Sequence, residues 1–376
     1  VYKICKKEVK LEEMLENPEC EKISYKTDEN VKKITMKRIA EEAAVSVSCV
    51  ARCVNKSGYV AEEKRRRICE VMDRLHYIPN QQAKCLRDGC SKLIGHIHVT
   101  SEENIFFTKI AATIEKESFT RGYKTISIAF EEGNMEMVEN QLRDLLAYRV
   151  DGIILNPGIN GRIVRELGEK VKGLTIPTVM IERPADVYEV EKVLVDNTEG
   201  SYIATERLLA AGHRKIVYLG RESEEPVEQE RYHGYVQAMR GVDDAYVQRH
   251  SYFTQEYTVE HGFMKCMEIL EKMGEDMPTA IFASSDILAA GVLRALYEKK
   301  IRVPEDISVI GYDDTIAKFL SPPLSTMRLP VREIAEAAVD ALITKLEKPG
   351  GNSGNRTVKI GPVYVERNSV RDLNRK

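Results

Sequence analysis

Three of the short apolar runs in this chain end in polar residues, and an arginine lies between them in the sequence. These residues are Glu182 and Arg183 after TVMI, Arg231 in RYHGYVQAM, Ser284, Ser285 and Asp286 after AIFA, and Asp313 and Asp314 after ISVIGY. In open α/β sheets, ligands bind beyond the carboxyl ends of the strands, so we expect these side chains to line a binding site. Carboxylates and arginine form paired hydrogen bonds in a fixed geometry, which suits the vicinal hydroxyls of a sugar or sugar phosphate.

A second group of residues has the spacing of a helix-turn-helix. Thr35 can cap a helix over MKRIAEEA, and after a tight break Ser46 can cap a second helix over residues 47–54. The side chains that point away from the apolar side of this second helix are Val47, Ser48, Ala51 and Arg52. In such a motif the second helix enters the major groove of DNA, where an arginine can form a bidentate contact with guanine.

The charge of the chain is concentrated around the same motif. Residues 31–92 carry a net charge of +7 and the remainder carries −10, although the whole chain is only −3. A compact basic module on an acidic body predicts a polyanionic partner for the module alone.

The motifs of enzymes and metal sites are missing from the sequence. It has no GxSxG, GxxxxGK[ST], HExxH or CxxC, and its seven histidines do not group. We therefore predict no catalytic residues, no cofactor and no metal, and interpret the eight cysteines as free thiols. No apolar run reaches 18 residues and the charged start lacks the apolar core of a secretion signal, so we expect a cytoplasmic protein without membrane contact.

From Leu93 onward, short apolar runs alternate with longer amphipathic stretches. This alternation predicts parallel sheets with right-handed crossovers. The eight or so strands are too many for one small sheet, and a new series starts at Asp196, so we expect two lobes. The predicted strands are residues 93–99, 125–130, 152–155, 178–181, 193–195, 216–219, 280–283 and 307–310, with helices over 109–121, 135–148, 200–211 and 259–273.

Longer stretches of sequence resemble the lac repressor family. TMKRIAEEAAVSVSCVARCVN, SGYVAEEKRRRI and LHYIPNQQAKCLRDG are similar to its DNA-binding headpiece. VDNTEGSYIATERLLAAGHRKIVYLG, PTAIFASSDILAAGVLRAL and VPEDISVIGYDD are similar to its sensor body. The resemblance implies an all-α helix-turn-helix headpiece and an α/β core like that of periplasmic sugar-binding proteins, with two Rossmann-like parallel sheets.

The resemblance also implies a division of the chain. Residues 1–33 would be an N-terminal extension, expected to be disordered, followed by the helix-turn-helix domain over 34–79. Residues 80–91 would be a hinge helix and linker, and 92–371 the core for effector binding and dimerisation. Lobe 1 would comprise about 92–193 and 331–358, and lobe 2 about 194–326 and 359–371.

Site residues follow from the resemblance position by position. Base contacts would come from Val47, Ser48 and Arg52, and backbone contacts or positioning from Thr35, Lys37, Ser46, Asn55, Tyr77 and Asn80. The hinge would enter the minor groove through Ala83 and Leu86. The effector would meet Phe106, Phe107, Glu182, Arg183, Arg231, Ser285 and Asp313.

Four headpiece positions depart from the family pattern, and two of them, Cys49 and Ala51, replace the usual threonine and serine. Ala44 stands where the family usually has glycine, which costs about 1 kcal/mol if the turn needs a positive φ. Ala61 stands where a serine usually caps the third helix.

The expected function is that of a sequence-specific transcriptional regulator, in particular a repressor, whose operator affinity depends on a small molecule bound between the lobes. A sugar is favoured, and a purine or nucleoside remains the alternative. A solute-binding protein would share the core, but it would need a secretion signal and would lack the headpiece. The C-terminal ERNSVRDLNRK has no leucine heptads, so we expect a homodimer on double-stranded DNA. Whether the effector is an inducer or a corepressor stays open.

Overall fold

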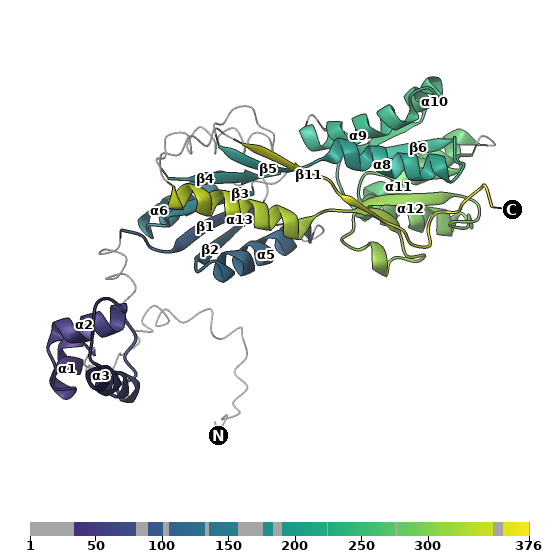
Figure 1. The fold of residues 1–376 in the computed structure, drawn as a ribbon. Helices are drawn as coiled ribbons and strands as arrows, with labels where there is room; N and C mark the ends of the chain where they lie inside the picture. The colour runs from purple at the N-terminus through teal and green to yellow at the C-terminus, as the bar shows by residue number, and fades with distance from the viewer. Residues whose placement is uncertain are drawn as a thin grey trace, which may run out of the picture. The chain divides into compact units, whose positions relative to one another are not determined.

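The computed structural model describes residues 34–79, 89–100, 105–131, 135–156, 176–182, 190–223, 225–274, 277–348 and 356–375. It forms two compact units, residues 1–83 and 84–376 (Figure 1).

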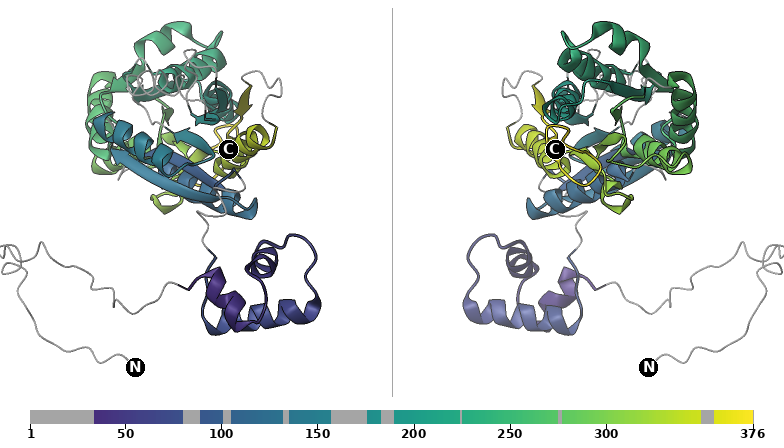
Figure 2. Two further views of the ribbon diagram at one scale, coloured as in Figure 1. Left: turned by 90° about the vertical axis from the view of Figure 1, so that its left-hand side faces the viewer. Right: turned by 90° about the vertical axis from the view of Figure 1, so that its right-hand side faces the viewer.

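The described part of the first unit contains three helices set at steep angles to one another (Figure 2). They are α1 (Met36–Glu42), α2 (Val47–Asn55) and α3 (Glu62–Arg74). Ile39, Val50 and Ile68, one from each helix, are fully buried in a common core. An apolar residue every three or four positions brings these side chains to the inner faces of the helices.

Both predicted helix caps of this unit are confirmed. The Thr35 hydroxyl accepts a hydrogen bond from the Arg38 amide at 3.3 Å, and the Ser46 hydroxyl accepts one from the Cys49 amide at 3.3 Å. Ala61, by contrast, precedes α3 without any side-chain cap. The turn between α1 and α2 places Ala44 at a φ of 52°, in the left-handed region that favours glycine.

In the second unit, lobe 1 is built on a parallel sheet with the strand order β11-β5-β4-β3-β1-β2. Helices cover both faces. A Cβ on Gly152 would lie 2.7 Å from Leu342 of α13 (Val331–Glu347), and one on Gly95 would lie 2.7 Å from Leu145 of α6 (Met135–Ala147). Gly152 pairs with Ile94, so the next residue, Gly95, faces the other way. The strands are Leu93–Thr100 (β1), Lys124–Glu131 (β2), Gly152–Asn156 (β3), Thr178–Ile181 (β4), Glu191–Val195 (β5) and Thr357–Ile360 (β11).

Lobe 2 is built on a second sheet with the order β12-β10-β9-β8-β6-β7, in which only the β10–β12 pair is antiparallel. Helices α8 (Asn197–Ala210) and α9 (Pro226–Met239) pack together on one side, and α11 (Val259–Met273) and α12 (Asp286–Glu298) on the other (Figure 1). The strands are Ile216–Arg221 (β6), Ser251–Thr254 (β7), Ala280–Ala283 (β8), Ser308–Asp313 (β9), Ser325–Arg328 (β10) and Val363–Val365 (β12). The remaining helices in the described segments are α5 (Phe106–Thr120), which packs beside α13 in lobe 1, α10 (Asp244–Arg249) and the 3-10 helix η3 (Ala317–Phe319).

Within the described residues, the chain passes between the two sheets three times. The first crossover joins β5 to α8, the second joins β10 to α13, and the third joins β11 to β12. Because β5 continues to Val195 and β11 to Ile360, lobe 1 extends two residues beyond the predicted limits at 193 and 358. None of the helices in the described segments has the length and apolarity needed to span a bilayer.

Replacing Ala44 by glycine should stabilise the first unit by about 1 kcal/mol, because glycine adopts the positive φ without a Cβ clash. Hydrogen exchange of the α3 core amides in the full chain would measure this gain. Ala51→Gly is the control: it lies inside α2 and should destabilise the unit by about 1 kcal/mol. If the α3 core amides exchanged as fast as in the wild type, or faster, after Ala44→Gly, the strain argument would be contradicted.

Candidate functional site

One side of α2 is open to solvent in the first unit. Val47 is 46% exposed, and Ser48 and Arg52 are also exposed, whereas Val50 and Cys53 on the opposite side are buried. Positions 47, 48 and 52 share this side because a helix repeats every 3.6 residues. The Ser48 hydroxyl lies 3.0 Å from that of Ser46, so the first turn presents two adjacent hydroxyls beside an arginine. The predicted base-reading residues thus form one exposed strip.

The other predicted positioning residues have mixed surroundings. Lys37 is exposed, whereas Asn55 and Tyr77 are half-buried, and burial raises the pKa of the Tyr77 hydroxyl. Asn80, Ala83 and Leu86 lie outside the described residues. Two large apolar residues of this unit that the sequence analysis did not single out, Tyr59 and Ile78, are 86% and 85% exposed.

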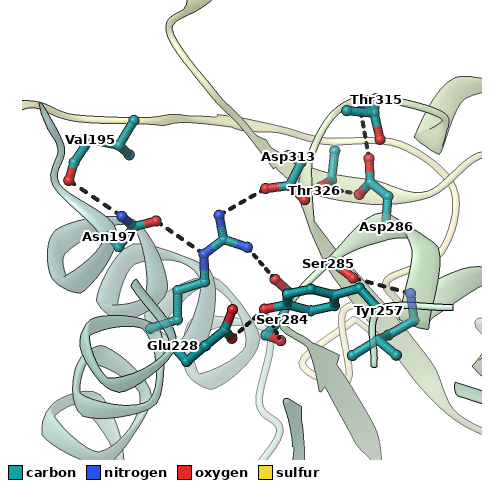
Figure 3. Close-up of polar contacts among 12 residues, drawn as sticks. Val195, Asn197, Glu228, Tyr257, Ser284, Ser285, Asp286, Asp313, Thr315 and Thr326 are labelled. Carbon is teal, nitrogen blue, oxygen red and sulfur yellow. Dashed lines mark hydrogen bonds and ion pairs between the residues drawn. The ribbon is translucent and has the colours of Figure 1, made fainter. Parts of the chain in front are cut away.

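In lobe 2, the guanidinium of Arg231 forms hydrogen bonds with Asn197, Ser284 and Asp313, which are labelled in Figure 3. Its Nε donates to Asn197 Oδ1 at 3.0 Å, its Nη1 to the Ser284 carbonyl at 2.6 Å, and its Nη2 to Asp313 Oδ1 at 2.9 Å. The side chains of Arg231 and Asp313 are only 7% and 6% exposed. Helix α9 starts at Pro226, so Arg231 lies in its second turn.

Topology explains why these residues meet. Asp313 is the last residue of β9, Ser284 follows β8, and these two strands are parallel neighbours. Their carboxyl ends therefore lie at one edge of the sheet. Asn197 is the first residue of α8, directly after the first crossover, and its Nδ2 donates to the Val195 carbonyl at 3.4 Å. The predicted Ser285 is also at this edge, where its hydroxyl caps α12 by accepting from the Leu288 amide at 3.2 Å.

Two further residues of this cluster were missed by the sequence analysis. The Tyr257 hydroxyl donates to Glu228 Oε2 and lies 3.3 Å from the Ser284 hydroxyl (Figure 3). Burial raises the pKa of Glu228, and the nearby charge of Arg231 opposes that rise. Glu228 stands three positions before Arg231, and this spacing places both on one face of a helix. The spacing could have identified Glu228 from the sequence as a neighbour of Arg231. Tyr257 follows β7, a strand that the sequence analysis did not predict.

A third carboxylate, Asp286, lies under the same edge. Its Oδ1 accepts from the Thr326 hydroxyl at 2.6 Å and its Oδ2 from the Thr315 amide at 2.7 Å. Burial, followed by the negative charge of Asp313, raises the pKa of Asp286 from 3.8 to about 7. Burial also raises the pKa of Asp313, and its ion pair with Arg231 lowers it.

Three of the predicted effector residues lie in the described part of lobe 1. Phe106 and Phe107 are buried in the first turn of α5, edge to face with their ring centroids 5.5 Å apart. Glu182 follows β4 at a φ of 66° and is half-buried. Burial raises the pKa of Tyr312 in lobe 2, and the charges of Asp313 and Glu182 add to this rise. Arg183 lies outside the described residues, and no His, Cys, Asp and Glu cluster suited to a metal occurs among those described.

Comparisons with known proteins match both units. Residues 35–80 match the model for bacterial regulatory proteins of the lacI family, and residues 205–370 that for a periplasmic binding protein-like domain. The ribose operon repressor of Haemophilus influenzae is 32% identical over 340 residues, 90% of this chain and 99% of that protein. The HTH-type transcriptional repressor PurR of Actinobacillus pleuropneumoniae is 30% identical over 91% of this chain and 99% of its own length. The lac repressor dimer bound to operator and the anti-inducer ONPF superposes with a TM-score of 0.77 at 25% identity, covering 90% of this chain and all of that one.

The raised pKa of Asp286 predicts a stability that depends on pH. Because the folded-state pKa, about 7, exceeds the ordinary 3.8, the folded state binds the proton more tightly. The resulting stabilisation is complete below about pH 4 and is lost as the pH rises through 7, by up to about 1.4 kcal/mol per pH unit.

Urea unfolding of the wild type and Asp286→Asn between pH 5 and pH 8 measures this effect. The variant does not titrate at this position, so the wild type should lose stability relative to it as the pH rises. Asp306→Asn is the control, because its ion pair with Arg302 keeps the pKa of Asp306 at about 2, below the range tested. Parallel profiles for the wild type and Asp286→Asn would show that Asp286 is ionised throughout.

Proposed function

Because the chain belongs to the lacI family of bacterial regulatory proteins, we propose that it is a transcriptional repressor that binds operator DNA through α2 and releases or tightens this contact in response to a small molecule. The observation that carries the proposal is the exposed strip of Val47, Ser48 and Arg52, placed on a capped and packed second helix. A solute-binding protein has no use for such a strip. We further propose that the repressor acts in the cytoplasm, where its DNA target is.

DNA reading follows from the chemistry of this strip. Arg52 can donate two hydrogen bonds to O6 and N7 of a guanine, and Val47 and Ser48 can contact the neighbouring base edges in the major groove. Lys37 can pair with phosphate, a contact that adds affinity without sequence information. A homodimer would present two such strips to a pseudo-palindromic site, and the lac repressor structure is a dimer on its operator.

The small molecule would bind at the carboxyl ends of β8 and β9. Asp313 and Glu228 supply carboxyl oxygens there, whereas Arg231 supplies N–H donors. This acceptor-rich set suits a ligand with several hydroxyls, so we propose a sugar as the effector. Glu182, Phe106 and Phe107 would approach it from lobe 1. A purine or nucleoside would use the aromatic pair and is the second candidate.

Arg52→Ala should weaken binding to the preferred site by roughly 1–3 kcal/mol and relax the preference at one base pair. The preferred site would first be selected from random DNA duplexes with the wild-type protein, and affinities then measured by fluorescence anisotropy. Lys37→Ala is the matched control, since loss of a phosphate contact should weaken all duplexes alike and reduce the salt dependence. Equal losses on selected and random DNA for Arg52→Ala would refute its role in base reading.

Arg231→Lys should remove the response to effector and leave DNA affinity within about twofold of wild type, because lysine keeps the charge but lacks the planar fork. Pentoses, hexoses and nucleosides would be screened by thermal shift, since a ligand that binds the folded state raises its stability. The compound with the largest shift would then be used in the DNA-binding assay. Arg302→Lys, in a surface ion pair with Asp306, is the control. A wild-type response in Arg231→Lys would assign Arg231 a structural role only.

A further inference from the structure

Backbone pairing connects Asp313, the partner of Arg231, to the crossovers between the lobes. Asp313 pairs with Arg328 in the β9–β10 ladder, and Arg328 pairs on its other side with Val363 of β12. Arg328 is the last residue before the second crossover, and Val363 is the first strand residue after the third. The Leu329 amide, inside the second crossover, also points to the Asp313 carbonyl at 3.5 Å. The end of β9 is therefore bound by its backbone to two crossovers.

The side chain of Asp314 forms a second connection. Its Oδ2 accepts from Arg328 Nε at 2.7 Å and its Oδ1 from Arg367 Nη2 at 2.6 Å, and the side chain is only 9% exposed. Arg367 follows β12 and is itself fixed, because its Nη1 donates to the Leu324 carbonyl at 2.8 Å. Asp314 thus joins the chain before the second crossover to the chain after the third.

The backbone at this point is held in an unfavourable conformation. Asp313 and Asp314 have φ values of 103° and 53°, which residues with a Cβ rarely adopt. Such a conformation persists only where the surroundings enforce it. Here Asp286 fixes the following amide, that of Thr315, and the two arginines fix Asp314. Loss of one of these contacts should let the turn relax and move Asp313.

Tyr312 connects the cluster to the remaining elements. Its ring lies 4.0 Å from Arg231 Cζ, so the guanidinium stacks on it. A Cβ on Gly200 would collide with the Tyr312 hydroxyl and with Pro362, so the start of α8, the tyrosine and the third crossover are in close contact. The Asp196 amide, in the first crossover, donates to the Ile360 carbonyl at 3.0 Å and so joins the first crossover to the third.

We propose that Asp314 is a positioning residue that couples the Arg231–Asp313 pair to the crossovers between the lobes. Its two ion pairs hold the strained turn against the second and third crossovers, so a change at Arg231 alters the stability of those crossovers. The inference rests on the proposed function for its biological role: a ligand that engages Arg231 and Asp313 differently in two lobe arrangements would shift the balance between them. The coupling itself exists without ligand and can be measured without one.

The test is hydrogen exchange on the full chain, with no DNA or small molecule added. In Asp314→Asn the amides of Leu329 and Asp196 should exchange about tenfold faster than in the wild type, because two hydrogen bonds between charged groups are weakened. The amides of β3 and β8 should stay within about twofold. Asp306→Asn is the matched control: it breaks a bidentate pair with Arg302, at 2.6 and 2.9 Å, away from the crossovers. It should leave the Leu329 and Asp196 amides unchanged.

A double-mutant cycle tests the coupling to the cluster. Arg231→Lys should also accelerate the Leu329 amide, and its effect should shrink at least about threefold when Asp314 is already asparagine. Additive effects would overturn the proposal, as would acceleration confined to residues 313–316 or spread equally over lobe 2. Arg328→Gln keeps the test decisive if Asp314→Asn does not fold. Arg328→Gln removes only the ion pair between the half-exposed Arg328 side chain and Asp314. It should accelerate the same amides, Leu329 and Asp196, by a smaller factor. Because no effector is used, failure of the sugar proposal and failure of this coupling are separate results.

Discussion

Burying the guanidinium of Arg231 removes a charge from water at a cost of several kcal/mol, and the surrounding residues have to offset it. Asp313 supplies the opposite charge, and the Ser284 carbonyl and Asn197 amide oxygen accept the other hydrogen bonds. These partners come from β9, the end of β8 and the start of α8. Buried ion pairs of this kind seldom add net stability, but a wrong arrangement leaves a charge unpaired, so they enforce one arrangement of the elements that bear them.

The cluster contains more acid than base. Glu228, Asp286 and Asp313 lie near the single charge of Arg231, and burial raises the pKa of all three. Because the pKa of Asp286 is raised to about 7, a proton held there near neutral pH reduces its repulsion with Asp313. The excess of oxygen acceptors also supports the proposal of a ligand rich in hydroxyl donors at this edge. The same carboxylates are therefore relevant to stability, to pH dependence and to ligand choice.

The sequence predicted most clearly those elements that are buried on both faces. β3 and β8 are apolar runs because helices cover both sides, and both were found at nearly their observed bounds. β7, β10, β11 and β12 were not, since polar or partly exposed residues interrupt the apolar pattern. The contact of Tyr257 with Glu228 joins residues 29 apart, and no local pattern encodes it. The positive φ of Ala44 was foreseen from resemblance alone, and the roles of individual residues toward DNA and effector stay predictions.

The three crossovers have a consequence for how the chain is made. Lobe 1 takes β1 to β5 from residues before 196, but its α13 and β11 come from residues after 330. Lobe 2 likewise lacks β12 until residue 365 has been added. During synthesis the ribosome therefore releases the three-helix unit as a complete folding unit long before either sheet can be finished. The apolar face that awaits α13, and the open edge of β5, stay uncovered until almost the whole chain has emerged. A cell that makes this protein quickly would depend on chaperones to shield those surfaces during that interval.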